Sequence, residues 1–307
     1  MFEKDYKNDI STQIRLRCLE YVPSHVSLIH NRGDQKKVPS CSFTKGNTQG
    51  NLVIKSKLDE PIDSVSIFVT LTGKYIYNKS NKSDVKFSYP EIVFFYAEIA
   101  VLTNILIKKE NTFPIDFGGL QIQYESYEGI YFRSCYSLEL WMQRKGKNIY
   151  YKREDIIVRA PQPFQKTFNR PLQLRNLRIN NVFDSIIALP SHTFPLNGMI
   201  LSQIVFSVVD STIRFVEVAL CRAEMCTVDN IFGEQSFTKL NIHSIDEAPV
   251  VNQMYIVRFK LANYILYPSF NDRIKRIEVK YFLQYKIIFE NEKPYLYEFP
   301  IRLVRSE

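Results

Sequence analysis

The sequence predicts an all-β protein built of two β-sandwich domains, and three observations lead to this prediction. Apolar and polar side chains alternate over long stretches, most clearly over residues 64–77 and 276–304. Such alternation is typical of half-buried strands, because successive side chains of an extended chain point to opposite sides of a sheet. The 307 residues, 45% of them hydrophobic, are enough for two cores of about 150 residues each. Helical periodicity is limited to a short candidate at residues 180–189.

The first half of the chain carries strand patterns after a mixed N-terminal segment. Residues 13–19 alternate, while the Pro-, Ser-, Asn- and Lys-rich residues 23–51 predict a long loop. We expect the strands that follow to form the first sandwich, at residues 51–58, 64–77, 92–108, 113–117, 130–143 and 150–158. Two of these strands should each bury one face, formed by Val65, Ile67, Val69 and Leu71 and by Tyr136, Leu138, Leu140 and Met142.

The second half repeats this texture and ends in a predicted hairpin. Its strands are expected at residues 198–209, 213–224, 237–245, 254–261, 276–290 and 295–304. Three prolines separate the halves, and proline lacks the N–H that a central strand must donate: Pro161, Pro163 and Pro171. The sequence therefore predicts one domain at residues 1–160, a linker at residues 161–178 and a second domain at residues 179–307.

The cysteines and the N-terminal residues indicate the cellular compartment of the protein. The five cysteines, at positions 18, 41, 135, 221 and 226, show no CxxC spacing, and the N-terminus lacks an apolar signal core. We therefore expect reduced thiols and a cytoplasmic protein. The longest apolar run, residues 92–107, is broken by Glu98 and Asn104 and is shorter than the ~20 residues of a membrane-spanning helix.

The net charge of +8 raises the question of an anionic partner. The basic residues that gather in the middle of the chain are Arg144, Lys145, Lys147, Lys152 and Arg153. They are interpreted either as solvated turns or as a weak docking surface for anionic membrane lipid. Lysines and tyrosines occur together between residues 147 and 152, which leaves a third interpretation, a basic sandwich that binds single-stranded nucleic acid. Its affinity for an oligonucleotide would decrease steeply as salt rises.

Catalytic patterns are weak. The four histidines show no HExxH spacing, there is no GxSxG elbow, and glycine loops that cradle phosphate are missing. Glu125 and Glu128 lie in one turn, which disfavours an acid/base pair across a cleft. Cys221 and Cys226 lack further metal ligands and read better as small buried side chains. The sequence therefore predicts a protein that is not an enzyme and needs no cofactor or metal.

Several motifs occur in a fixed order along the chain. FPIDF at 113–117 leads into YESYEG at 124–129, whose Gly129 is expected to turn the chain with a φ that other residues avoid. VEVALCRAEMC follows at 216–226, IDEAPV at 245–250 and VKYFL at 279–283. Together they resemble the arrestin-like vacuolar-protein-sorting family, which includes the small subunit of retromer and its paralogue in retriever, named from the Down syndrome critical region. The resemblance covers about residue 43 to the end.

The resemblance implies two arrestin-like β-sandwich domains in tandem and a scaffolding role. It implies a subunit of an endosomal cargo-retrieval complex, either retromer or retriever (Commander), whose C-terminal domain binds a large α-solenoid subunit; sorting nexins or cargo tails are further partners. The chain stops at Glu307, directly after its last strand, which favours the retriever type. The partner-binding residues implied by the resemblance are Ser244, Ile245, Asp246, Pro249, Val250 and Met254.

This family pattern has departures and alternatives. Glu247 and Asn252 replace glycines of the family's partner loop. Ile245 either anchors the partner or packs into its own sandwich. A generic arrestin-domain adaptor is the main alternative function, although the PPxY motif that such adaptors use is missing from this sequence.

Overall fold

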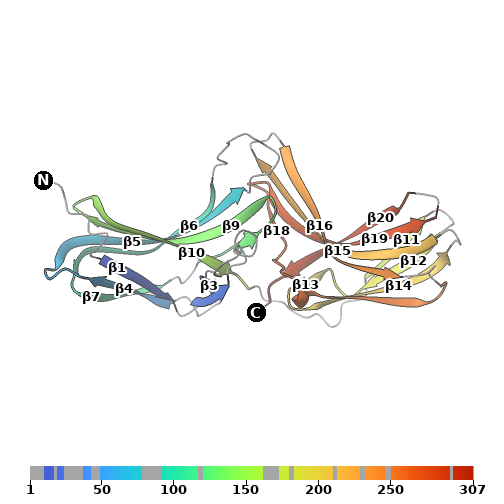
Figure 1. The fold of residues 1–307 in the computed structure, drawn as a ribbon, viewed down its shortest axis with the longest axis horizontal. Helices are drawn as coiled ribbons and strands as arrows, with labels where there is room; N and C mark the ends of the chain where they lie inside the picture. Colours follow the sequence, from blue (N-terminus) through green and yellow to red (C-terminus); the bar gives the residue numbers. More distant parts are fainter. Residues whose placement is uncertain are drawn as a thin grey trace. The chain divides into compact units, whose positions relative to one another are not determined.

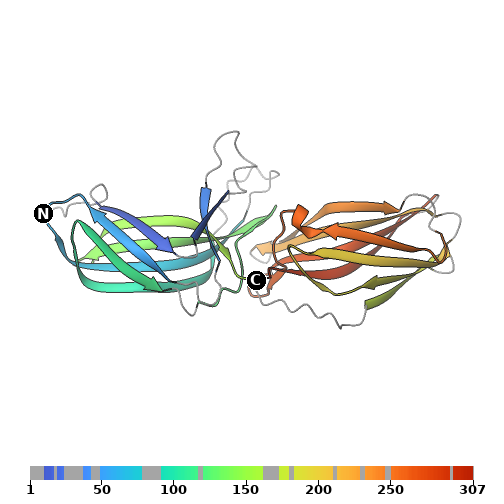
Figure 2. The same cartoon turned by 90° about the horizontal axis from the view of Figure 1, so that it is seen from below.

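The computed structural model consists almost entirely of β-strands, as the sequence predicts, with a single 3-10 turn, η1 (Leu261–Asn263), in the described part of the chain (Figure 1). The structure describes residues 10–16, 19–23, 37–42, 49–77, 91–116, 120–161, 173–179, 183–209, 213–228, 232–245, 250–290 and 293–306. The chain divides into two compact units, residues 1–161 and residues 162–307. Each unit contains two sheets (Figure 2).

The N-terminal unit contains a three-stranded sheet and a seven-stranded sheet. The first has the order β1-β4-β7, and the second has the order β2-β3-β10-β9-β5-β6, with β8 paired to β9. Their strands are β1 (Ile10–Leu16), β2 (Leu19–Pro23), β3 (Lys37–Ser42), β4 (Gln49–Ser56), β5 (Ile62–Tyr77), β6 (Ile92–Ile107), β7 (Glu110–Asp116), β8 (Tyr127–Glu128), β9 (Phe132–Arg144) and β10 (Lys147–Arg159).

The core of this unit lies between the two sheets. The predicted apolar faces of β5 and β9 are buried as expected, and Leu52, Ile54 and Ile115 of the smaller sheet belong to the same cluster. Burial of a large apolar side chain contributes about 1.5–3 kcal/mol, so these alternating rows hold the two layers together. A two-residue turn, Lys145 and Gly146, joins β9 to β10 with φ of +49° and +76°.

The C-terminal unit also forms a sandwich, of four and six strands. The smaller sheet has the order β11-β12-β14-β17, and the larger has the order β13-β20-β19-β15-β16, with β18 paired to β19. The strands are β11 (Gln173–Ile179), β12 (Phe183–Leu189), β13 (Thr193–Pro195), β14 (Met199–Val209), β15 (Ile213–Val228), β16 (Phe232–Ile245), β17 (Met254–Lys260), β18 (Phe270–Asp272), β19 (Ile277–Phe289) and β20 (Tyr295–Val304).

The predicted closing hairpin is the centre of this unit's core. β19 pairs with β20 in antiparallel register, with Leu283 opposite Phe299, and both side chains are buried. Across the interior, the hydroxyls of Ser202 on β14 and Tyr285 on β19 lie 2.8 Å apart in a buried hydrogen bond. This contact joins the four-stranded layer to the six-stranded layer.

The structure corrects three predictions. Residues 173–178, assigned to the linker, belong to β11, because Leu177 and Ile179 alternate into the core after the last proline. The helical candidate at residues 180–189 contains strand β12, whose Phe183, Ile187 and Leu189 are buried. The predicted N-terminal loop contains β3, which pairs in parallel with β10. Pro163 and Pro171 lie outside the described residues.

Candidate functional site

The motif at residues 124–129 is fastened to its own sandwich. The Tyr136 hydroxyl donates to the carbonyl of Tyr124, and Ser134 Oγ donates to the carbonyl of Glu125 at 2.7 Å. The carboxylate of Glu125 accepts the backbone N–H of Ala160 at 2.9 Å. These contacts tie the motif to β9 and to the end of β10, which is a structural role. Positive φ was expected at Gly129, but among the described glycines only Gly146 has it.

The predicted partner residues divide into a buried and an exposed part. Ile245, the last residue of β16, pairs with Val216 and is only 8% exposed, so its side chain packs into its own sandwich. Ser244 beside it is exposed. Asp246 and Pro249 lie outside the described residues. Val250 and Met254 are 58% and 54% exposed.

The turn before β17 explains one departure from the family pattern. Asn252 has a φ of +63°, and its N–H donates to the carbonyl of Phe206 at 2.7 Å. Positive φ favours glycine, and asparagine is among the residues that tolerate it best. Asparagine therefore substitutes for glycine at this position with the turn intact.

Met254 lies on an apolar outer face of the four-stranded sheet, and Val250 precedes its strand, β17, in the chain. One row across its strands runs Asn176, Ile186, Val205 and Met254, and the next runs Leu174, Ala188, Gln203 and Ile256. Leu174, Ile186 and Ile256 are exposed. We call four of the exposed apolar residues of this surface the outer apolar face: Leu174, Ile186, Met254 and Ile256. An exposed cluster of this kind marks an interaction site more often than scattered apolar residues do.

Sequence reasoning missed three residues of this face. Leu174 fell in the predicted linker, Ile186 fell in the helical candidate, and Ile256 was taken only as part of a strand. Each of the three alternates with a buried residue, Leu177, Ile187 or Val257, and this alternation could have shown that it points outward. Only the register of four strands, however, places the three residues on one surface.

The structure does not gather the five predicted membrane-facing cations on one surface. Lys152 and Arg153 are neighbours in β10 and so point to opposite sides of the sheet. Arg144 is paired with Asp63, Arg153 lies 3.2 Å from Asp155, and Lys152 donates to the carbonyl of Thr12 at 3.0 Å. Lys145 and Lys147 remain exposed at the hairpin tip. This pairing also weakens the nucleic-acid reading of residues 147–152.

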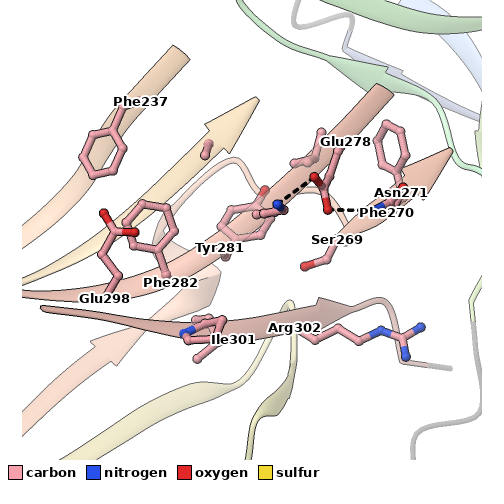
Figure 3. Close-up of a pocket in the computed structure, with 14 residues that line it drawn as sticks. Phe237, Ser269, Phe270, Asn271, Glu278, Tyr281, Phe282, Glu298, Ile301 and Arg302 are labelled. Carbon is pink, nitrogen blue, oxygen red and sulfur yellow. Dashed lines mark hydrogen bonds and ion pairs between the residues drawn. The ribbon is translucent and has the colours of Figure 1, made fainter. Parts of the chain in front are cut away.

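A hollow of about 630 Å³ lies in the C-terminal unit where β18 and β20 diverge along β19 (Figure 3). The rings of Phe237 and Phe282 line one side with centroids 5.0 Å apart. The Glu278 carboxylate is held by Lys280 Nζ at 2.8 Å and by Asn271 Nδ2 at 2.7 Å (Figure 3). The charges at this end of the hollow are therefore engaged within the protein.

The described reactive groups outside these surfaces concern metal binding and a buried thiol. In the described residues, no three His, Cys, Asp or Glu side chains cluster in a way that would hold a metal ion. Burial raises the pKa of the Cys221 thiol to about 12, so this sulfur is protonated at neutral pH. No helical segment within the described ranges is long and apolar enough to cross a bilayer.

Comparison with known proteins matches the fold. The family model for vacuolar protein sorting-associated protein 26 matches residues 11–292. The chain is 25% identical over 301 residues to vacuolar protein sorting-associated protein 26 of Dictyostelium discoideum, which covers 92% of this chain and 82% of the relative. The Drosophila melanogaster protein of that name is 26% identical over 198 residues, 64% of this chain and 41% of the relative.

A human relative gives the same picture. Vacuolar protein sorting-associated protein 26B of Homo sapiens is 25% identical over 201 residues, 65% of this chain and 59% of the relative. The matches therefore span less than two thirds of the length of the fly and human relatives. Since the family model covers nearly the whole described fold, the chain belongs to the vacuolar protein sorting-associated protein 26 family, with an all-β, arrestin-like architecture.

Proposed function

We propose that this chain is the arrestin-like subunit of an endosomal cargo-retrieval complex, of the retromer or the retriever (Commander) type. Family membership supports the sorting role. Two sandwiches whose outward residues include exposed apolar clusters are suited to hold other proteins. In this proposal the chain transforms no substrate, and its function is to bring partners together.

The single observation that carries the proposal is the outer apolar face. Met254 and Ile256 are 54% and 45% exposed on the edge strand β17, and Leu174 extends the face across the sheet with 61% exposure. Binding energy at interfaces concentrates in a few apolar side chains that lose water on association. We propose that the α-solenoid subunit covers this face, and that Ser244, Asp246, Pro249 and Val250 contribute further contacts.

Ile245 has a different part in this proposal. Its side chain is 8% exposed and pairs with Val216, so it has little surface left to give to a partner. We propose that Ile245 holds the end of β16 in place, directly before Asp246 and Pro249 in the chain. In this proposal the partner contacts the outer apolar face and the residues that follow Ile245 in the chain.

The test is co-purification with a co-expressed solenoid subunit. The variant Met254→Asp with Ile256→Asp places two charges on the face that must lose water, and we expect it to lose co-elution with an unchanged melting temperature. The matched control is Val93→Asp with Val101→Asp, which changes two residues of the other unit's edge strand that are 48% exposed each. Retained co-elution of the β17 variant would contradict the proposed surface.

The type of complex needs a separate measurement. Affinity purification of the tagged chain from its native cells, with identification of the large helical subunit that co-purifies, distinguishes the retromer solenoid from the retriever solenoid. Recovery of neither subunit under mild conditions would contradict membership in both complexes. Sorting nexins or cargo tails recovered together with the solenoid would support the retrieval role.

Contact with acidic endosomal lipid is a smaller part of the proposal. Lys145 and Lys147 at the β9–β10 hairpin tip are the exposed members of the basic set. Each Lys near an anionic membrane surface contributes about 1 kcal/mol. Flotation with phosphatidylserine vesicles should therefore decrease in Lys145→Glu with Lys147→Glu, and equal flotation of the variant would remove the lipid contact.

A further inference from the structure

A second outward surface, on the seven-stranded sheet of the N-terminal unit, combines aromatic rings with carboxylates. Strands β10, β9, β5 and β6 are consecutive neighbours there. One row across them runs Arg153, Glu139, Thr70 and Glu98. The next row runs Tyr151, Trp141 and Phe68. Glu139 and Glu98 therefore stand on either side of Thr70, two strand spacings or about 10 Å apart at the backbone.

The side chains of these rows enclose a hollow of about 280 Å³. Thr70 is short and forms its floor between the two carboxylates, while Phe68, Tyr96 and Trp141 provide aromatic walls. Tyr151 continues the aromatic surface, with its ring centroid 4.2 Å from that of Trp141. Tyr96 and Tyr151 are 60% and 40% exposed, so the rings are open to a partner.

In the described part of the chain, neither carboxylate of the hollow has a cation within ion-pair distance, although Arg153 is near enough to interact electrostatically with Glu139. Glu98 accepts a long hydrogen bond of 3.4 Å from the Tyr96 hydroxyl, and Glu139 accepts one of 3.3 Å from Ser137 Oγ. Neither forms an ion pair with another described residue. Arg153 lies opposite Glu139 in the register, but its Nε donates to Asp155 at 3.2 Å.

We infer that this hollow binds a cationic side chain, an arginine or lysine carried by a basic segment of a partner protein. Local charge complementarity identifies the occupant, because Glu98 and Glu139 both line the hollow and form no ion pair with a described residue, although the chain as a whole carries a net charge of +8. The aromatic walls also favour a cationic occupant, since guanidinium and ammonium groups bind over ring faces, best over tryptophan. Arginine should bind more tightly than lysine, because its planar group stacks on a ring while it donates to a carboxylate.

This site lies beside the edge strand β6, where an extended segment can approach. Glu98 is the one charged residue of β6, and Val93, Tyr96, Val101 and Leu106 of this strand are exposed. The lysines that usually protect a long edge strand are absent from it. The inference is independent of the solenoid contact, because it concerns a different unit of the chain and is tested without that partner.

The experiment uses Trp141, which is the only tryptophan of the chain and lines the hollow. The purified full chain is titrated with a Gly- and Ser-flanked peptide that carries two arginines, and the tryptophan emission is followed. The matched peptide replaces arginine with citrulline, which keeps the shape and removes the charge. We expect saturable binding of the arginine peptide, weaker binding of a lysine peptide, and no binding of the citrulline peptide.

Two variants test the carboxylates. Glu98→Gln with Glu139→Gln should weaken binding of the arginine peptide at least about tenfold. A hydrogen bond to a charged group is strong enough that losing one lowers the affinity by about this factor. Glu110→Gln with Asp59→Asn removes two exposed carboxylates that pair with Lys55 and Lys109, and it should bind like the parent. Melting temperatures of both variants should match the parent.

Three results would overturn the inference. The first is absence of saturable binding by the arginine peptide. The second is equal affinity for the arginine and citrulline peptides, which would indicate an uncharged aromatic site. The third is an equal loss of affinity in both double variants, which would indicate a general effect of net charge.

Discussion

The outward faces of two sheets, one in each unit, contrast in chemistry although both cover a core built the same way. The outer apolar face of the C-terminal unit presents Leu174, Met254 and Ile256. The corresponding outward surface of the seven-stranded sheet presents Trp141 and Tyr96 beside Glu98 and Glu139. The first is suited to binding by loss of water, and the second to binding a charged group, with affinity that falls as salt rises.

In both units, the inward and outward residues of one strand have different roles. Inward residues such as Leu283 and Leu140 are interchangeable in kind between the units, because any well-packed apolar side chain stabilises a sandwich core. Outward residues are free from that demand, so they can differ between units and determine which partners are recognised. Substitutions on the inner and outer sides of one strand should therefore affect different measurements.

The largest expected effect on stability comes from a charge placed on the inner side. Ile245→Asp should lower the free energy of unfolding by about 3–5 kcal/mol, because the carboxylate would be buried without a partner. Urea denaturation measures this directly. Ile256→Asp on the outer side is its counterpart and should change stability by less than about 0.5 kcal/mol. Equal effects of the two substitutions would break the distinction between the sides.

A cavity in the core should have the next largest effect. Leu283 is fully buried, and Leu283→Ala should cost about 2–5 kcal/mol through lost contacts and the space left behind. Binding to either proposed partner, measured well below the melting temperature, should stay unchanged. An unchanged melting temperature would show that this face of β19 is misassigned.

The Cys221 thiol should make stability depend on pH in alkaline solution. Burial raises its pKa from 9.0 to about 12, so the folded chain keeps a proton that the unfolded chain loses. The stabilisation is complete below the unfolded pKa and is lost as pH rises through the folded pKa. Between about pH 8 and about pH 10, the parent should therefore lose more stability in urea than Cys221→Ala. Parallel losses in the two proteins would contradict a protonated buried thiol.

The smallest effect should come from an ion pair on the outer side of the four-stranded sheet. Arg178 donates to Asp184 through two nitrogens, at 3.1 and 2.7 Å. Its side chain is largely exposed, so Arg178→Ala should cost at most about 1 kcal/mol. Thermal melting in low and high salt should show that even this small difference decreases with salt. A loss as large as that of Leu283→Ala would mean that outward residues also determine stability.

Sequence periodicity predicted the parts of the fold in which one strand carries its own evidence. β5, β9, β19 and β20 each have enough alternating residues to show which face is buried. β11 and β12 are seven residues each, and their short patterns were outweighed by nearby prolines and by a brief helical period. β3 is held by a parallel pairing to β10, which has no local signal in the sequence.

The sites were harder to predict than the strands. Met254 was found through a resemblance, but Leu174, Ile186 and Ile256 join it only through the register of four strands. Glu98 and Glu139 are 41 positions apart in the sequence and meet only because Thr70 of β5 pairs with both. For Ile245 the sequence left two interpretations open, and its burial at 8% exposure favours packing into its own sandwich.

The hydroxyl pair of Ser202 and Tyr285 has a consequence for the uniqueness of the C-terminal sandwich. If one layer slid by a residue over the other, the apolar side chains would still find apolar neighbours, but two hydroxyls would be stranded in a dry interior. A stranded buried hydroxyl costs about 1–3 kcal/mol, so misaligned packings are disfavoured by a contact that adds little to the aligned one. The hydroxyl pair therefore fixes the position of one layer relative to the other, and with it the relative positions of the residues on their outer surfaces.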